Sequence, residues 1–253
     1  MASRSRPINL PAPYLRRVWL EPSRVADRAA YPFCLPFLGD DFELSFDRAI
    51  TIIVGENGTG KSTLLEGIAV LAGYDEAGGG KGYRGVDHSR ALEVGGSTLA
   101  TALRAAWRPR ITDGWFFKAE TFFSIARYLD EAAREPLSGP PPDYLSHSHG
   151  EGFLRFFEER CRRQGIYFFD EPESALSRNH WSNSATSVLG RSAYPICSAI
   201  SMTVWGRTPP SRWSCRSTFG AAMIVARSGP ERGLGLGSGR GLTVSPLGGR
   251  GRG

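Results

Sequence analysis

The chain has 253 residues, of which 41% are hydrophobic and 22% are charged, as expected for a globular protein with a buried core. No apolar run approaches the ~18 residues of a membrane helix, and the first residues lack an apolar signal segment. The cysteines Cys34, Cys161, Cys197 and Cys215 form no CxxC pair, which argues against a zinc site or a disulfide framework. We therefore expect a cytoplasmic protein.

The net charge of +6 is unevenly distributed along the chain. Residues 178–253 contain ten Arg, no Lys and a single acid, Glu231, which gives a net charge of +9. Residues 1–177 carry a net charge of −3. The basic character therefore belongs to the C-terminal part, and the first 177 residues do not suggest a large nucleic-acid footprint.

The first half of the chain predicts three strands and a helix. Residues 14–21 and 42–46 have strand-like patterns, and the β-branched run AITIIVG at 49–55 predicts a strand buried on both faces. After a glycine-rich turn, apolar residues at helical spacing predict a helix over 62–73, with Gly73 as its C-cap.

The second part predicts an inserted helical subdomain, at about residues 75–150, followed by another buried strand. The expected elements are a glycine-rich loop at 75–90, helices at 97–107, 119–134 and 150–165, a proline-rich loop at 137–143 and a strand at 166–171.

Residues 55–62, GENGTGKS, fit the pattern G-x-x-x-x-G-K-[ST] of a phosphate-binding P-loop. Its glycines let backbone N–H groups turn toward phosphates, and the following helix presents its positive end. Lys61 is expected to reach the β- and γ-phosphates, and the Ser62 hydroxyl to bind Mg²⁺. The predicted ATP-binding residues are Gly55, Glu56, Asn57, Gly58, Thr59, Gly60, Lys61, Ser62 and Thr63.

The run IYFFDE at 166–171 provides the acids that such a site requires. A buried strand would carry Asp170 to the Mg²⁺ shell at the carboxyl edge of the sheet. Glu171 follows directly and is placed to polarise the attacking water. Lys61 and Glu171 are the predicted catalytic residues.

Together, ITIIVGENGTGKSTLLEGIA and FFDEPESALS resemble the ABC-type ATPases. They are most similar to the soluble bacterial branch of AAA-family, or structural-maintenance-of-chromosomes/RecF-like, ATPases. The resemblance implies an α/β P-loop NTPase core over residues 1–177, with a mixed sheet flanked by helices. It also implies Mg²⁺-dependent hydrolysis of ATP. An ATP-switched nucleic-acid-binding or DNA-repair module and the ATP-binding subunit of a transporter are the alternatives.

The resemblance further implies a signature motif, which we assign to LSHSHGEGFL at 145–154. Ser148 and Gly150 would contact the γ-phosphate of ATP held by a second protomer, in a head-to-tail homodimer that encloses two ATP. The same residues also fit an ordinary helix N-terminus. Glu120 stands where the family has a glutamine, and Tyr31 or Phe33 is a candidate to stack on adenine unless both serve only as packing residues.

After residue 177 the resemblance implies a helix, a strand and a histidine that contacts the γ-phosphate, but residues 178–253 do not provide this pattern. Three interpretations are a segment translated out of frame, a disordered tail and an Arg/Gly-rich arm that binds nucleic acid. The first is favoured because a shifted frame after 178 can encode the start of an amphipathic helix. Without the missing strand and histidine, we expect an exposed sheet edge, poor solubility and weak turnover.

Overall fold

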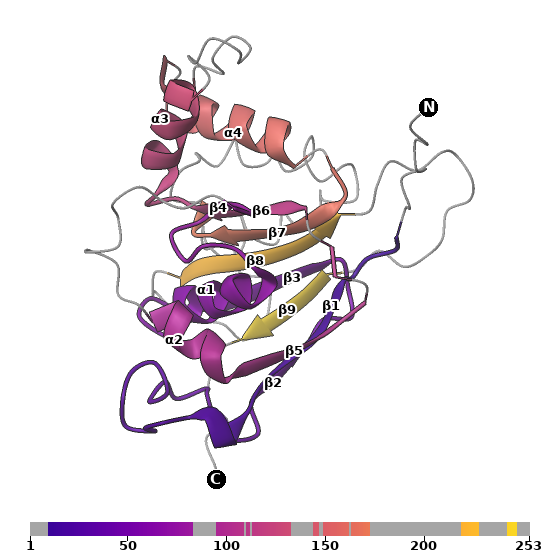
Figure 1. Ribbon diagram of the computed structural model, residues 1–253, viewed down its shortest axis with the longest axis vertical. Coiled ribbons are helices and arrows are strands. Elements are labelled where there is room, and N and C mark those ends of the chain that lie inside the picture. Colours follow the sequence, from indigo (N-terminus) through magenta and orange to yellow (C-terminus); the bar gives the residue numbers. More distant parts are fainter. Residues whose placement is uncertain are drawn as a thin grey trace, which may run out of the picture.

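The computed structural model describes residues 10–82, 95–108, 110–111, 113–132, 144–146, 149–161, 163–172, 219–227 and 242–246. Two sheets and several helices form a mixed α/β arrangement (Figure 1). The elements are β1 Leu15–Leu20, η1 Pro22–Arg24, β2 Glu43–Ser45, β3 Ile50–Glu56, α1 Lys61–Ala72, β4 Gly79–Gly80, α2 Gly95–Ala102, β5 Leu103–Trp107, β6 Gly114–Lys118, α3 Phe122–Ala132, η2 Tyr144–Ser146, α4 His149–Arg160, β7 Gly165–Asp170, β8 Phe219–Arg227 and β9 Leu242–Pro246.

The larger sheet has the strand order β4-β6-β7-β8-β3-β9. Strand β8 runs antiparallel to both of its neighbours, β3 and β7. Since each of them opposes β8, β3 and β7 run in the same direction, and their carboxyl ends lie at one edge of the sheet. Strand β6 is parallel to β7 and ends at that edge too.

The expectation of a disordered C-terminal tail is wrong for residues 219–227 and 242–246. Strand β8 pairs along the whole of β3, from Ile50 opposite Val225 to Glu56 opposite Phe219. Strand β9 pairs with the other side of β3. The physical reason is that β3 and β7 carry backbone groups that need partners, and the apolar run in β8 supplies them on both sides. The sheet edge that was expected to be exposed beside β3 and β7 is therefore occupied by β8. The out-of-frame origin of residues 178–253 stays a prediction about the gene.

The smaller sheet has the order β2-β1-β5, and all of its pairs are antiparallel. The helix predicted over 97–107 is wrong for its second half. The observed helix α2 ends at Ala102, and residues 103–107 form the strand β5. Pairing with β1, such as Trp19 opposite Arg104, outweighs the helical preference of this segment. Leu15, Val18 and Leu20 of β1 enter the core that α1 and α2 share.

The helical subdomain is shorter than the sequence suggested. Instead of filling about 75–150, it consists of α3, η2 and α4, while the preceding residues provide β4, α2, β5 and β6. In Figure 1, α3 and α4 lie together beyond the β4 and β6 side of the sheet. Phe156 of α4 contacts the rings of Trp115, Phe117, Phe122 and Tyr144, which joins the subdomain to β6. The proline-rich loop predicted at 137–143 lies outside the described residues.

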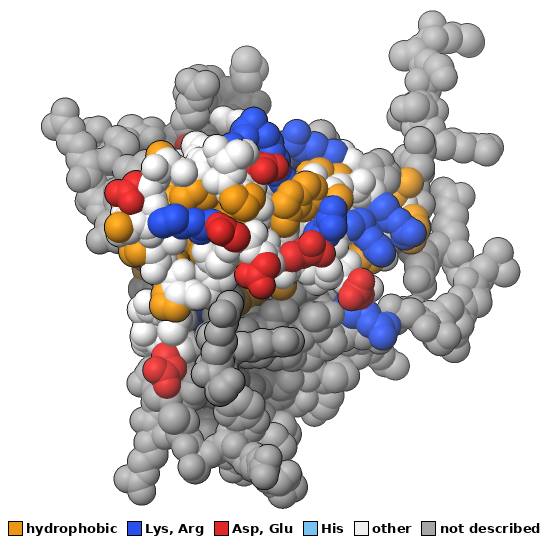
Figure 2. Space-filling view, turned by 90° about the horizontal axis from the view of Figure 1, so that it is seen from below, with side chains coloured by type: hydrophobic (Ala, Val, Ile, Leu, Met, Phe, Trp, Pro, Cys, Tyr) orange, Lys and Arg blue, Asp and Glu red, His pale blue; other side chains and the backbone are white. Residues whose placement is uncertain are grey.

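The described surface carries charges of both signs. On the face shown in Figure 2, Lys and Arg side chains alternate with Asp and Glu side chains, and hydrophobic groups lie between them. The described residues on this face therefore form no continuous basic surface of the kind typical of a large nucleic-acid footprint. Within the described part of the chain, every helix is too short or too polar to cross a membrane.

The position of β8 predicts a strong effect of proline at its centre. Ile224 lies opposite Thr51 of β3 and Phe168 of β7. Ile224→Pro should lower the free energy of unfolding by about 1 to 3 kcal/mol through the lost backbone hydrogen bond alone. Urea denaturation followed by circular dichroism measures this, with Ile224→Val as the control. Equal stabilities of the two variants would mean that residues 219–227 do not pair in the sheet.

Candidate functional site

The loop between β3 and α1 has the shape that its glycines predict. Gly60, the residue before α1, has φ +86°, in the left-handed region that favours glycine. A Cβ at Gly60 would also lie 2.7 Å from Leu35 Cδ1. The helix begins immediately afterwards, with Leu64 N donating to Gly60 O at 2.9 Å. The backbone of the turn therefore favours glycine at position 60, and a larger residue there would also displace the side chain of Leu35.

Lys61 lies within the curve of this loop. Its side chain is only 5% exposed, and Nζ donates to Gly55 O at 2.9 Å and to Glu56 O at 2.7 Å. These bonds join the two ends of the loop and hold the ammonium against its first residues. This arrangement concentrates positive charge where the P-loop pattern predicts phosphates.

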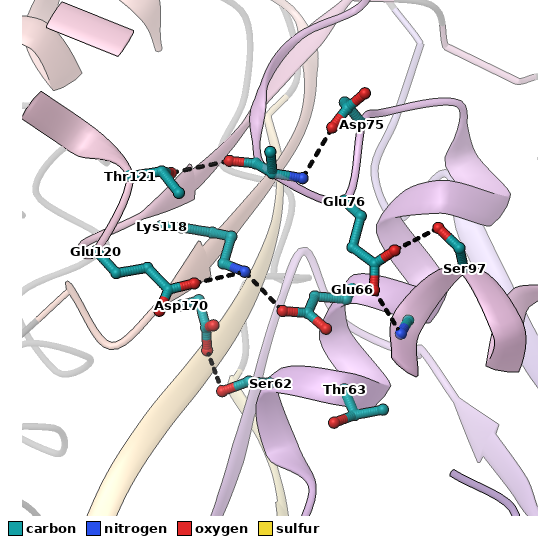
Figure 3. Close-up of polar contacts among 12 residues, drawn as sticks. Ser62, Thr63, Glu66, Asp75, Glu76, Ser97, Lys118, Glu120, Thr121 and Asp170 are labelled. Carbon is teal, nitrogen blue, oxygen red and sulfur yellow. Dashed lines mark hydrogen bonds and ion pairs between the residues drawn. The ribbon is translucent and has the colours of Figure 1, made fainter. Parts of the chain in front are cut away.

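Ser62 and Asp170, 108 residues apart in sequence, meet at the carboxyl edge of the sheet. Ser62 Oγ donates to Asp170 Oδ1 at 3.0 Å (Figure 3). The contact follows from the topology, because β3 leads into α1 at the edge where β7 ends at Asp170. A hydroxyl and a carboxylate oxygen, two of the hard ligands that Mg²⁺ prefers, are thus held side by side.

Burial dominates the electrostatics of Asp170. Desolvation raises the pKa of its carboxyl group from 3.8 to about 6, although Lys118 and the Ser62 hydrogen bond both lower it. The neighbouring carboxylates of Glu171 and Glu120 add to the increase. A divalent cation would favour the ionised form, so the burial of this side chain suits a metal-linked role.

Glu171 follows Asp170 with φ 47°, in the left-handed region, which is unusual for a residue other than glycine. Such a conformation costs about 1 to 2 kcal/mol. Glu171 is exposed, in contrast to the buried Asp170. Strained residues of this kind gather at functional sites, where the surrounding structure fixes them.

Lys118, at the end of β6, matches no sequence motif and is revealed only by the structure. Its Nζ pairs with Glu66 Oε1 at 2.6 Å and with Glu120 Oε1 at 2.7 Å (Figure 3). Burial raises the pKa of Glu66 to about 7 despite the lowering effect of Lys118. For Lys118 itself, burial lowers the pKa, but the two carboxylates more than compensate and raise it. The available signal was a lysine directly after the aromatic run Trp115–Phe117, two residues before Glu120.

The two candidates for the adenine-stacking residue differ in exposure. Tyr31 is 47% exposed, and its hydroxyl is hydrogen-bonded to the Thr63 hydroxyl at the start of α1. Phe33 is 7% exposed and belongs to the hydrophobic core. Tyr31 is thus the accessible aromatic ring next to the P-loop helix.

Of the two predicted signature residues, Gly150 belongs to a different part of the fold. Gly150 lies in the first turn of α4, in the helical subdomain, whereas Ser148 lies outside the described residues. The other predicted residues lie on β3, the following loop, α1 and the end of β7. The structure therefore brings together the P-loop and Asp170 and leaves Gly150 on a separate element.

A family model described as an AAA domain matches residues 33–104. The matched segment contains the P-loop, α1 and α2, and it points to a nucleotide-binding ATPase domain. Asp170 and Glu171 lie beyond it, so their part in the site rests on the geometry. No curated protein and no solved structure matches the chain.

The raised pKa of Asp170 predicts a pH-dependent gain in stability when its charge is removed. Between pH 3.8 and about 6 the folded chain binds this proton more tightly than the unfolded chain, so the ionisation of Asp170 reduces stability as pH rises. Asp170→Asn should therefore be more stable than the wild type by about 1 to 3 kcal/mol at pH 8, and not at pH 4. Urea denaturation at both pH values measures this. Asp41→Asn, at an exposed loop position, is the control, and an equal gain at both pH values would contradict the prediction.

Proposed function

We propose that this chain binds ATP with Mg²⁺ at the carboxyl edge of β3 and β7 and hydrolyses it. The observation that carries the proposal is the 3.0 Å hydrogen bond between Ser62 Oγ and Asp170 Oδ1. It joins the serine of a P-loop to an aspartate at the end of a buried strand, and both residue types are expected at that place in an ATPase. The AAA-domain match over residues 33–104 supports the same class.

The phosphates of ATP would lie on the loop from Gly55 to Thr63. Lys61 is already inside the loop, and the N-terminus of α1 adds its partial positive charge. Tyr31 would face the base, because it is the exposed ring that contacts Thr63. In this arrangement the phosphates of ATP would lie at Lys61 and Ser62, and the base would lie at Tyr31.

The residues present fit Mg²⁺. This ion is usually held by one or two protein oxygens, and water and substrate phosphates complete its octahedral shell. Ser62 and Asp170 supply two such oxygens, and the described residues contain no cluster of three or more metal-binding side chains. When bound, Mg²⁺ would neutralise charge that develops on the phosphates.

Glu171 would orient the attacking water and accept its proton. It is exposed beside Asp170, and its left-handed backbone turns it out of the line of β7. The rest of the catalysis would be positioning and charge stabilisation by Lys61 and the loop. Turnover by this chain is expected to be weak, because the histidine implied by the resemblance is missing from its sequence.

The proposed active form is a head-to-tail dimer that encloses two ATP. Ser148 and Gly150 of one protomer would contact the γ-phosphate bound by the other. The position of Gly150 in the first turn of α4 supports this, since a helix N-terminus presents N–H groups to an anion. The placement of Gly150 outside the P-loop elements also agrees with a contact made between protomers.

Removal of the Lys61 ammonium should abolish nucleotide binding. In Lys61→Ala, the two bonds to Gly55 O and Glu56 O are lost, together with the cation that would face the phosphates. We expect the affinity for a fluorescent ATP analogue to fall at least about 100-fold, which corresponds to roughly 2.7 kcal/mol. Lys81→Ala, at a half-buried lysine outside the loop, is the matched control. Tight binding by Lys61→Ala would refute the assignment of this site.

Glu171→Gln should retain ATP binding and slow hydrolysis, which would accumulate the ATP-bound dimer. Size-exclusion chromatography with light scattering should show a dimer with Mg²⁺ and ATP and a monomer without nucleotide. Glu43→Gln, at an exposed glutamate of β2, should behave as the wild type. A Glu171→Gln variant that binds ATP but remains monomeric would contradict the dimer and leave the nucleotide site intact.

A further inference from the structure

The side chain of Tyr31 reaches two different parts of the proposed nucleotide site. Its ring is 47% exposed, whereas its hydroxyl is hydrogen-bonded to the Thr63 hydroxyl of α1. Thr63 is only 6% exposed and directly follows Ser62, but it lies on another side of the helix from the contact between Ser62 and Asp170 (Figure 3). An exposed ring suits a contact with the base. It does not by itself explain why the hydroxyl reaches the turn that would hold the phosphates.

Tyr31 belongs to a loop, residues 28–40, whose two ends are joined by Arg28. The Arg28 guanidinium donates to Leu38 O at 2.8 Å and pairs with the carboxylate of Asp40. Leu38 is buried in the hydrophobic core, which anchors the far end of the loop. Loops with joined ends are compact and pack through their own side chains. The Arg28 loop, as we call this segment, therefore holds Tyr31 in a defined position.

The Arg28 loop packs against the turn between β3 and α1. A Cβ at Gly60 would lie 2.7 Å from Leu35 Cδ1 and 3.1 Å from Phe37 Cε1, so both side chains lie against the last residue before α1. A Cβ at Gly95, the first residue of α2, would lie 2.7 Å from Tyr31 Cε1. The ring thus rests on the start of α2, and the loop fixes it relative to both helices.

The pair of hydroxyl groups has a chemically preferred direction. Each hydroxyl can donate one proton and accept at two lone pairs. A phenol is a stronger donor than an aliphatic alcohol, which favours Tyr31 as the donor and Thr63 as the acceptor. The Thr63 proton can then be donated to a third group. A hydroxyl that already accepts a hydrogen bond is also a better donor, because linked hydrogen bonds polarise one another.

We propose that Tyr31 is a positioning residue for the phosphates. Through its hydroxyl it would orient the Thr63 hydroxyl to donate to a phosphate oxygen of the bound nucleotide, while the Arg28 loop holds Tyr31 in place. The inference rests on the proposed ATP site. It gives the Tyr31 hydroxyl a role at the phosphates that is separate from the contact between its ring and the base.

The test is a double-mutant cycle on the full chain, with the dissociation constant of a non-hydrolysable ATP analogue measured by calorimetry in the presence of Mg²⁺. Tyr31→Phe removes the hydroxyl and keeps the ring, so the contact with the base should persist. It should weaken binding about fivefold to tenfold, as expected for one hydrogen bond. Thr63→Val should weaken binding at least as much. In the Thr63→Val background, Tyr31→Phe should have no further effect, because its partner is already lost.

Two further variants separate positioning from general damage to the fold. Thr63→Ser keeps the hydroxyl, so Tyr31→Phe should still weaken binding in this background. Arg28→Gln loses the bond to Leu38 O and should weaken binding at least about twofold. Arg17→Gln, at an exposed arginine of β1 that pairs with Glu43, is the matched control and should bind as the wild type does. Wild-type affinity in Arg28→Gln would refute the role of the loop.

The remaining outcomes are distinguishable. Absence of binding by the wild type would overturn the proposed ATP site, and the inference with it. Equal affinities of the wild type and Tyr31→Phe would overturn the inference alone and leave Tyr31 only its ring contact. An equal loss from Tyr31→Phe with and without Thr63→Val would show that the hydroxyl acts elsewhere. Tighter binding by Tyr31→Phe would show that Tyr31 competes with the phosphates for Thr63, and either result overturns the inference.

Discussion

The antiparallel strand β8 between β3 and β7 is the constraint on which the site depends. By pairing with both neighbours it makes them run in one direction, so that the P-loop after β3 and Asp170 at the end of β7 reach the same edge. The hydrogen bond between Ser62 and Asp170 follows from this alignment. The main-chain pairing of a C-terminal segment therefore holds together a site whose side chains all come from the first 171 residues.

The same edge gathers more buried charge than packing alone would favour. Burial raises the pKa values of Glu66 and Asp170, and Lys118 opposes the shift at both. Groups perturbed in this way are common where a protein exchanges stability for function. The left-handed Glu171 adds backbone strain at the next residue. Electrostatic cost and backbone strain thus coincide within a few residues of the proposed metal ligands.

Local patterns were sufficient for the elements that carry the motifs. The β-branched run at 49–55 and the apolar spacing over 62–73 correspond to β3 and α1, and the run before Asp170 corresponds to β7. The sequence did not reveal β5, because residues 103–107 have a helical preference and become extended only by pairing with β1. Strands β8 and β9 were missed for a similar reason, since both pair with β3, which lies more than 150 residues away in the chain.

The sequence by itself predicted the P-loop, the acids at 170–171 and an ATPase chemistry, because these predictions depend on residue types at short spacing. Only the tertiary structure decided that Ser62 meets Asp170, that Tyr31 is accessible while Phe33 is buried, and that Lys118 bridges Glu66 and Glu120. Each of these depends on burial or on contacts between distant segments. Such contacts are set by the direction and register of strands, which no single segment of the chain encodes.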